Sequence, residues 1–228
     1  MAKLVQKSGY IKSGKASGYM RYIATREGVE KLAGNGAVTK GQRELIQKLL
    51  TDFPDAVELF EYEDYCKTPT LGTASAFISM ALDANLHEID SESGYMQYIA
   101  TRPRVQKRGT HGLFSSATAV DLASAMSELE AHEGNVWTII YSLRREDAAR
   151  LEYDNADAWR TLLMENAPTL AKSMKISLDN FHWYAAFHDE GHHPHIHMMV
   201  WSDDPKEGFL TKDGIAAMRS KLTNPIFR

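Results

Sequence analysis

Five of the chain's nine histidines fall within one stretch, "FHDEGHHPHIHMMVW", at residues 187–201. The segments "FHWYAAFH" (181–188) and "HIHMMVW" (195–201) are apolar and aromatic, as buried β-strands are. The six residues between them, "DEGHHP", are typical of a turn. The sequence therefore predicts an antiparallel hairpin that carries histidines on both strands.

The predicted hairpin brings three histidines together. Side chains alternate along a strand, so His195 and His197 point to the same face. His188 ends the preceding strand, and directly opposed residues of an antiparallel pair have Cβ atoms about 4.5–5.5 Å apart. Three neutral imidazoles with coordination positions left over are typical of a catalytic divalent-metal site. We predict that His188, His195 and His197 are metal ligands.

The turn supplies further candidates. His192 and His193 could form a rival site, but side chains in a turn are less fixed, so we assign His193 to a supporting or substrate-contacting position. A carboxylate near a ligating histidine can fix its tautomer or accept a proton. Glu190 is our first choice for that role and Asp189 the second, with simple solvation of the turn as the alternative. A set of satisfied polar residues remains the alternative for the whole cluster.

The rest of the chain indicates an α+β domain with an antiparallel sheet. A β-branched and aromatic run, "NVWTIIYSL" (135–143), predicts a central strand, and "LVQKSGYIKS" (4–13) predicts another. Pro168 is expected to start a second helix after 156–167. Helices are also predicted over 17–32, 41–50, 70–89, 115–134 and 210–222. At 228 residues the chain can build one good-sized core, or at most two small ones.

The net charge of −4 does not by itself indicate a nucleic-acid binder, but the basic residues are segregated. Seven lysines and arginines lie between residues 3 and 31, and four more between 102 and 108. Segregated charge permits a basic face, although a solvated surface without a partner is equally compatible. No apolar run approaches the roughly 18 residues of a membrane span, and the start of the chain lacks the apolar core of a signal peptide. With a single cysteine, a cytoplasmic protein is expected.

One segment is repeated: "SGYMRYIATR" (17–26) recurs as "SGYMQYIATR" (93–102). The repeat marks either a duplicated half or two equivalent helices that flank one site. In the first copy, helical spacing puts Tyr19 and Tyr22 on one face, among basic residues that favour a phenolate. An activated tyrosine can act as a covalent nucleophile. Packing of both rings in a core or interface is the alternative.

These motifs carry a resemblance to a known family. "HPHIHMMVW" resembles the histidine–hydrophobic–histidine motif of HUH endonucleases, and "FHDEGHHPHIHMMVWS" resembles the three-histidine motif of plasmid-mobilisation relaxases. "GYMRYIATREGVEKL" is similar to the N-terminal tyrosine motif of MobP/MobL-type relaxases of Gram-positive conjugative elements, and "TRPRVQKRGTHGLFS" (101–115) also looks typical of that group. The resemblance covers most of the chain.

The resemblance implies an HUH relaxase-like fold, with a central antiparallel sheet of about five strands, the histidine-bearing strands in its middle and helices outside. It implies a single relaxase domain over 1–228. His188, His195 and His197 match the metal ligands, and Tyr22 of "YIAT" matches the nucleophile. Tyr98 stands in equivalent local sequence, so the nucleophile stays open among Tyr22, Tyr19 and Tyr98. Such proteins often continue into a further C-terminal region.

The expected activity is nicking of one DNA strand at an origin of transfer, with a 5′-phosphotyrosine intermediate that can be rejoined. Mg²⁺ or Mn²⁺ is the expected ion, and histidine ligands would also favour Zn²⁺ or Ni²⁺ in purified protein. Single-stranded origin DNA is the expected partner, with accessory relaxosome and coupling proteins besides. Trp183, Trp201 or Tyr19 could stack on bases, unless they pack in the core. The residues expected to hold DNA phosphates are Lys12, Lys15, Arg21, Arg26, Arg102 and Arg104.

Three alternatives stay open. An HUH rolling-circle replication initiator would use the same chemistry. A metal-dependent phosphodiesterase would cleave with water and form no covalent intermediate. A DNA-binding regulator with a structural metal would not be an enzyme, but structural sites are closed and cysteine ligands are missing here.

Overall fold

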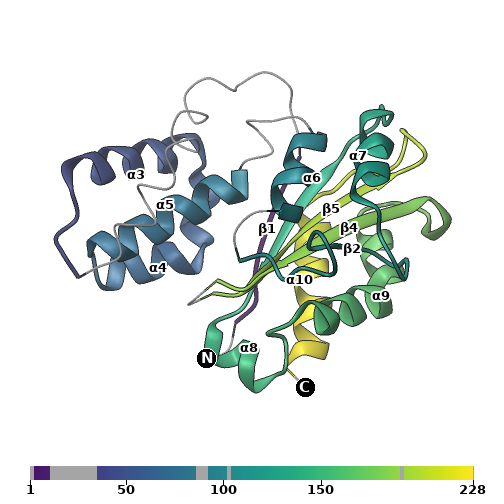
Figure 1. The fold of residues 1–228 in the computed structure, drawn as a ribbon. Helices are drawn as coiled ribbons and strands as arrows, with labels where there is room; N and C mark the ends of the chain where they lie inside the picture. The colour runs from purple at the N-terminus through teal and green to yellow at the C-terminus, as the bar shows by residue number, and fades with distance from the viewer. Residues whose placement is uncertain (1–2, 11–34, 86–91, 102–103, 191–192, 228) are drawn as a thin grey trace. The chain divides into compact units, whose positions relative to one another are not determined.

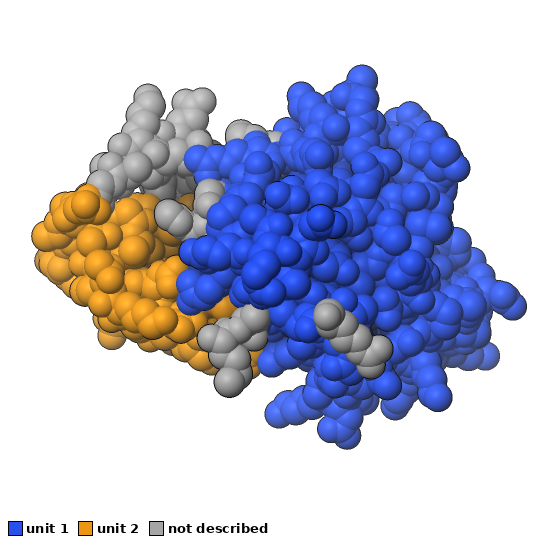
Figure 2. Space-filling model, turned by 90° about the horizontal axis from the view of Figure 1, so that it is seen from below, with its two compact units in different colours: residues 1–11, 91–228 blue, residues 12–90 orange. Residues whose placement is uncertain are grey.

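The computed structural model describes residues 3–10, 35–85, 92–101, 104–190 and 193–227. The chain divides into two compact units, coloured separately in Figure 2: residues 1–11 with 91–228, and residues 12–90. The prediction of a single domain over 1–228 stays a prediction.

The larger unit is built on a five-stranded antiparallel sheet with the order β1-β3-β5-β4-β2 (Figure 1). This confirms the predicted α+β class, with the two histidine-bearing strands side by side and β5 in the middle. The strands are β1 (Val5–Tyr10), β2 (Leu113–Phe114), β3 (Trp137–Ser142), β4 (Phe181–His188) and β5 (His195–Ser202).

The predicted hairpin is present, and its two strands are paired right up to the turn. β4 and β5 pair from Phe181 opposite Ser202 to His188 opposite His195. β3 pairs with β1 on one side and β5 on the other, so it is an interior strand, as its apolar run predicted. Because directly opposed residues share a face, the register alone places His188 and His195 together.

One face of the sheet carries the main hydrophobic core. Tyr141, Ile196 and Met198 alternate with the histidine-face residues and are fully buried on this side. They pack against α9 (Ala156–Ser173) and α10 (Lys212–Ile226). The largest core residue of these two helices is Trp159, in α9. Each large apolar side chain buried in this way stabilises the fold by roughly 1.5–3 kcal/mol. α10 begins at Lys212, and the hydroxyl of its N-cap Thr211 accepts a hydrogen bond from the Gly214 N–H.

Shorter helices complete the larger unit. α6 (Glu92–Thr101) contains residues 93–101 of the second copy of the repeat, and α7 (Leu122–Glu130) packs against it. α8 (Arg145–Arg150) follows β3.

The smaller unit is helical in its described part. Its elements are α3 (Lys40–Asp52), a 3₁₀ turn (Pro54–Glu58), α4 (Phe60–Lys67) and α5 (Leu71–Asn85). A capping box of Thr39 and Gln42 starts α3. Leu49 and Phe77 are fully buried between these helices.

Two boundary predictions were wrong. α9 runs without interruption through Pro168, which lacks the N–H that would bond the carbonyl of Met164 and whose ring crowds that carbonyl. Met164 is exposed, so this lies on the solvent side of the helix, where water can replace the donor. The predicted helix over 115–134 shortens to α7, since the Asp121 side chain accepts from the Ser124 N–H and caps the helix at that point.

None of the helices in the described ranges is long and apolar enough to cross a membrane. The helix predicted over 17–32 lies outside the described residues.

Candidate metal centre

Three histidines meet at the turn end of the β4–β5 hairpin. His188 ends β4, His195 starts β5 directly opposite, and His197 lies two residues further along β5. Their ring centroids are 5.2 Å (His188–His195), 4.6 Å (His188–His197) and 5.0 Å (His195–His197) apart. One ligand nitrogen from each ring lies within 4.8 Å of the others. The sequence-predicted ligands are therefore brought together.

The triad is enclosed: the exposed fractions of His188, His195 and His197 are 0%, 1% and 0%. Burying a polar ring costs free energy unless its nitrogens are satisfied. The Nε2 of His188 donates to the Ile99 carbonyl at 2.8 Å, and the Nδ1 of His195 donates to the His193 carbonyl at 3.0 Å. A carbonyl only accepts, so these two nitrogens carry the ring proton.

The hydrogen bonds fix which nitrogen can serve as a ligand. In the neutral rings the lone pair stands on Nδ1 of His188 and on Nε2 of His195. His197 contacts the Tyr95 hydroxyl through Nδ1, at 2.9 Å, which presents Nε2 as its other nitrogen. Metal-ligating histidines ordinarily bond their second nitrogen to a carbonyl or similar partner. The donor set therefore fits a divalent ion held by three imidazoles.

His193 contributes to this arrangement through its backbone. Its carbonyl orients His195, and the residue itself is buried, 4% exposed. A role for its imidazole stays a prediction, and His192 lies outside the described residues.

The acidic residues of the turn are bonded to arginines. Glu190 pairs with Arg104 (Oε2–Nη1, 2.5 Å), and Asp189 pairs with Arg145 (Oδ1–Nη2, 2.6 Å). Arg145 also donates to the carbonyl of Glu190. The predicted proton acceptor Glu190 is thus joined to a predicted phosphate-binding residue, Arg104, and both roles stay predictions. Arg145 was missed, although "LRRED" directly after a central strand was a usable signal.

Segment 104–106 lies alongside the end of β4. Val105 forms a bridge with His188, and the Gln106 N–H donates to the Phe187 carbonyl at 2.9 Å. Gly112 packs onto this segment: an added Cβ would lie 2.1 Å from Cγ2 of Val105. The triad is therefore supported from outside the hairpin by a tightly packed loop.

The remaining predicted residues fall into two groups. Tyr98, the alternative nucleophile, lies in α6 and is partly buried. The residues outside the described ranges are Lys12, Lys15, Tyr19, Arg21, Tyr22, Arg26 and Arg102.

The tryptophans expected as base-stacking candidates are packed inside. Trp183 is 5% exposed and belongs to the main core. Trp201 is 1% exposed and stacks on His182 and on Tyr184, with centroid distances of 5.7 and 5.6 Å. Core packing is therefore the role that the structure gives to both.

Tyr184 lies on the same face of β4 as His188. Its hydroxyl donates to the Glu128 carboxylate at 2.9 Å. Burial, together with this hydrogen bond and the nearby charge of Glu128, raises the pKa of Tyr184 to about 12. This tyrosine is therefore protonated throughout the neutral range.

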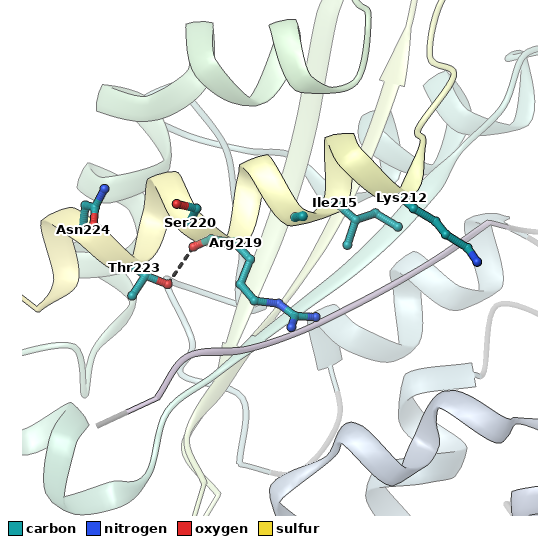
Figure 3. A pocket seen from close by; sticks show the side chains of 7 residues that line it. Lys212, Ile215, Arg219, Ser220, Thr223 and Asn224 are labelled. Carbon is teal, nitrogen blue, oxygen red and sulfur yellow. Dashed lines mark hydrogen bonds between the residues drawn. The ribbon is translucent and has the colours of Figure 1, made fainter. Parts of the chain in front are cut away.

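A surface pocket lies elsewhere, along α10 (Figure 3). Its lining includes Lys212, Arg219 and Thr223, and the backbone carbonyl of Arg219 accepts a hydrogen bond from the Thr223 hydroxyl. No histidine of the triad lines it, and α10 packs on the opposite face of the sheet. The pocket therefore belongs to a different part of the molecule from the candidate metal centre.

A family model described as MobL relaxases matches residues 1–227. No curated protein matches the chain, and no solved structure does.

Proposed function

Because the chain belongs to the MobL relaxase family, we propose that it nicks one strand at an origin of transfer and holds the cut 5′ end on a tyrosine. The family gives the nicking role, and the tyrosine transesterification is our proposal. The match with MobL relaxases favours this reading over a replication initiator.

The observation that supports the proposal is the buried triad. His188, His195 and His197 would hold a divalent ion, Mg²⁺ or Mn²⁺ in the working protein and Zn²⁺ or Ni²⁺ as an alternative after purification. Such an ion, when bound, supplies a Lewis acid that polarises the oxygens of the scissile phosphate. Two of the three ligands have their tautomers fixed by backbone carbonyls before any ion binds.

The covalent step is assigned to Tyr22. Its phenol oxygen bonds to phosphorus as the bond from phosphorus to the 3′-oxygen breaks. Glu190 is the proposed acceptor of the phenol proton, and the departing 3′-oxygen takes up a proton to leave as a hydroxyl. In the reverse reaction the 3′-hydroxyl attacks the tyrosyl phosphate, so no ATP is needed to rejoin the strand.

DNA would be held by the basic segments of the chain. Of the six residues proposed to contact phosphates, the structure describes Arg104, which lies beside the Glu190 turn. The proposed phosphate contacts are Lys12, Lys15, Arg21, Arg26, Arg102 and Arg104, with Tyr19 stacking on a base. Accessory relaxosome and coupling proteins are further proposed partners.

The test is a covalent-adduct assay. The protein is incubated with Mn²⁺ and single-stranded origin DNA labelled on the 3′ side of the expected nick, and the products are separated on a denaturing protein gel. The wild type should give a labelled protein band, and Tyr22→Phe should give none.

Matched variants decide between the tyrosines. Tyr19→Phe and Tyr98→Phe remove the same hydroxyl and should keep the adduct. If Tyr22→Phe keeps it and one of the others loses it, the nucleophile is reassigned. Cleavage without any adduct in the wild type would contradict the proposal and favour a phosphodiesterase that uses water.

A further inference from the structure

α6 lies directly against two of the three histidines. The Ile99 carbonyl accepts from Nε2 of His188 at 2.8 Å, and the Tyr95 hydroxyl lies 2.9 Å from Nδ1 of His197. Tyr95 and Ile99 are four residues apart, so they occupy one face of the helix. A single helix therefore sets the second nitrogen of two candidate ligands.

The end of α6 explains how a helix carbonyl becomes available. The last four carbonyls of a helix have no donor within it, and Ile99 stands in the last turn of α6, which ends at Thr101. The next carbonyl, that of Ala100, accepts from the Gly112 N–H at 2.8 Å. The Ile99 carbonyl thus bonds a histidine of the triad, and the Ala100 carbonyl bonds Gly112, which packs on the segment beside that histidine.

The contact of Tyr95 differs from that of Ile99 because a hydroxyl both donates and accepts. If Tyr95 donated, Nδ1 of His197 would hold the lone pair and Nε2 the proton. If Tyr95 accepts, Nδ1 holds the proton and Nε2 offers its lone pair. The second arrangement matches His188 and His195, whose proton-bearing nitrogens donate to backbone carbonyls.

We propose that Tyr95 is a positioning residue for the metal centre: its hydroxyl accepts a hydrogen bond from Nδ1–H of His197 and so keeps Nε2 available to a divalent ion. Tyr95 is fully buried, 0% exposed, and its ring meets that of His197 edge-on at 6.2 Å. The inference rests on the proposed function only in requiring that the triad binds an ion.

The proposal also assigns a task to the repeat. Aligning "SGYMQYIATR" with "SGYMRYIATR" pairs Tyr95 with Tyr19 and Tyr98 with Tyr22. In the second copy the first tyrosine supports a histidine. The second copy is therefore a support for the site, distinct from the nucleophile proposed in the first.

The first test measures metal affinity without DNA. Wild type, Tyr95→Phe and the matched control Tyr184→Phe are stripped of metal and titrated with Mn²⁺, with free Mn²⁺ read by electron paramagnetic resonance. Tyr95→Phe should weaken binding roughly 10–100-fold, and Tyr184→Phe should stay within about twofold of wild type. Co²⁺ titrations should show an altered visible spectrum for Tyr95→Phe alone, which a simple loss of stability would not produce.

The second test uses the wild type and does not depend on how the variant folds. In ¹⁵N-histidine spectra of the Zn²⁺-loaded protein, Nδ1 of His197 should carry the proton and Nε2 should be the ligand. A proton on Nε2, or unchanged Mn²⁺ affinity in Tyr95→Phe, overturns the proposal.

The outcomes separate this inference from the proposed function. Equal affinities together with a Tyr22 adduct would end the role of Tyr95 and leave the nuclease intact. Weakened binding in Tyr95→Phe without any adduct in the wild type would support the role of Tyr95 and end the transesterase. A wild type that binds no divalent ion would overturn both.

Discussion

Within the triad, each histidine uses one ring nitrogen to decide what the other can do. His188 and His195 each donate a hydrogen bond from their protonated ring nitrogen to a backbone carbonyl, so the other ring nitrogen holds a lone pair. Backbone acceptors are set by the fold and do not rotate as side chains do. The two rings are therefore preorganised by helix α6 and by the turn.

Replacing one ligand should abolish the stabilisation that an ion gives. At a concentration of 100 times Kd, a bound ligand stabilises the fold by about 2.7 kcal/mol, which for this chain length raises Tm by roughly 5–11 °C. We expect that rise for wild type with Mn²⁺ and none for His195→Ala, each compared by calorimetry with its own metal-free form.

The control is His182→Ala, on the same strand and face as His188. Its ring forms a hydrogen bond with Asp203 at 2.7 Å and lies apart from the triad, so Mn²⁺ should still raise the Tm of this variant. If Mn²⁺ raised the Tm of His195→Ala as much as that of the wild type, the ion would bind elsewhere.

Tyr184 should shape the alkaline limit of stability. Because its pKa in the folded protein is raised to about 12, above the ordinary value of 10, the folded state binds this proton more tightly than the unfolded state. The stabilisation is complete below pH 10 and is lost as the pH rises from about 10 to 12. Urea titrations should therefore show a shallower loss in that window for Tyr184→Phe than for wild type. Parallel curves would contradict the assignment.

The residues that could be predicted are those close together in sequence. The triad spans 188–197 on one hairpin, where alternation and a short turn dictate proximity. Tyr95 and Ile99 reach their histidines across 102 and 89 residues, a separation that no local pattern encodes. The repeat did draw attention to the segment that contains Tyr95. It did so through Tyr98, which is equivalent to Tyr22, and not through Tyr95 itself.

At the scale of elements, strands and caps were predictable where one local force dominates. The helix predicted over 210–222 is present as α10, and the Thr211 hydroxyl at its N-cap satisfies the Gly214 N–H. Pro168 was misjudged because its cost depends on whether the affected carbonyl faces water, which depends on tertiary packing. The end of β4 likewise depends on the distant segment 104–106 that bridges it.

Gly112 tests that dependence. An added Cβ would lie 2.1 Å from Cγ2 and 3.3 Å from Cβ of Val105, and 3.1 Å from the Gln106 carbonyl oxygen, so the segment beside His188 must move. Gly112→Ala should cost roughly 1–3 kcal/mol of unfolding free energy, as overpacking does. It should also weaken Mn²⁺ binding, because Val105 forms a bridge with the candidate ligand His188.

The matched control is Gly41→Ala in α3, where nothing lies within 4 Å of the added Cβ. This substitution should leave the unfolding free energy unchanged or raise it slightly, since alanine favours helix. A stable Gly112→Ala with unchanged ion affinity would show that the segment tolerates displacement.

At the scale of the whole molecule, the chain is an acidic protein proposed to bind a polyanion. The family match extends over both compact units, so the described sheet and the helical unit are parts of one relaxase sequence. With a net charge of −4, general attraction cannot carry DNA binding. Affinity must come from a local set of cations.

Salt dependence measures the size of that set. Each phosphate neutralised on a single strand contributes about −0.7 to the slope of log K against log salt, so the six proposed phosphate contacts predict a slope of roughly −4. Arg104→Gln should weaken binding and make the slope shallower by about 0.7, measured by fluorescence anisotropy with labelled single-stranded DNA. Arg150→Gln removes the same charge from another ion-paired arginine, bonded to Asp147, and should leave the slope unchanged.

Arg104 is paired with Glu190 at 2.5 Å, so its binding to DNA requires a phosphate to replace that carboxylate. Equal slopes for wild type and Arg104→Gln would mean that this exchange does not occur and that Arg104 serves the turn alone.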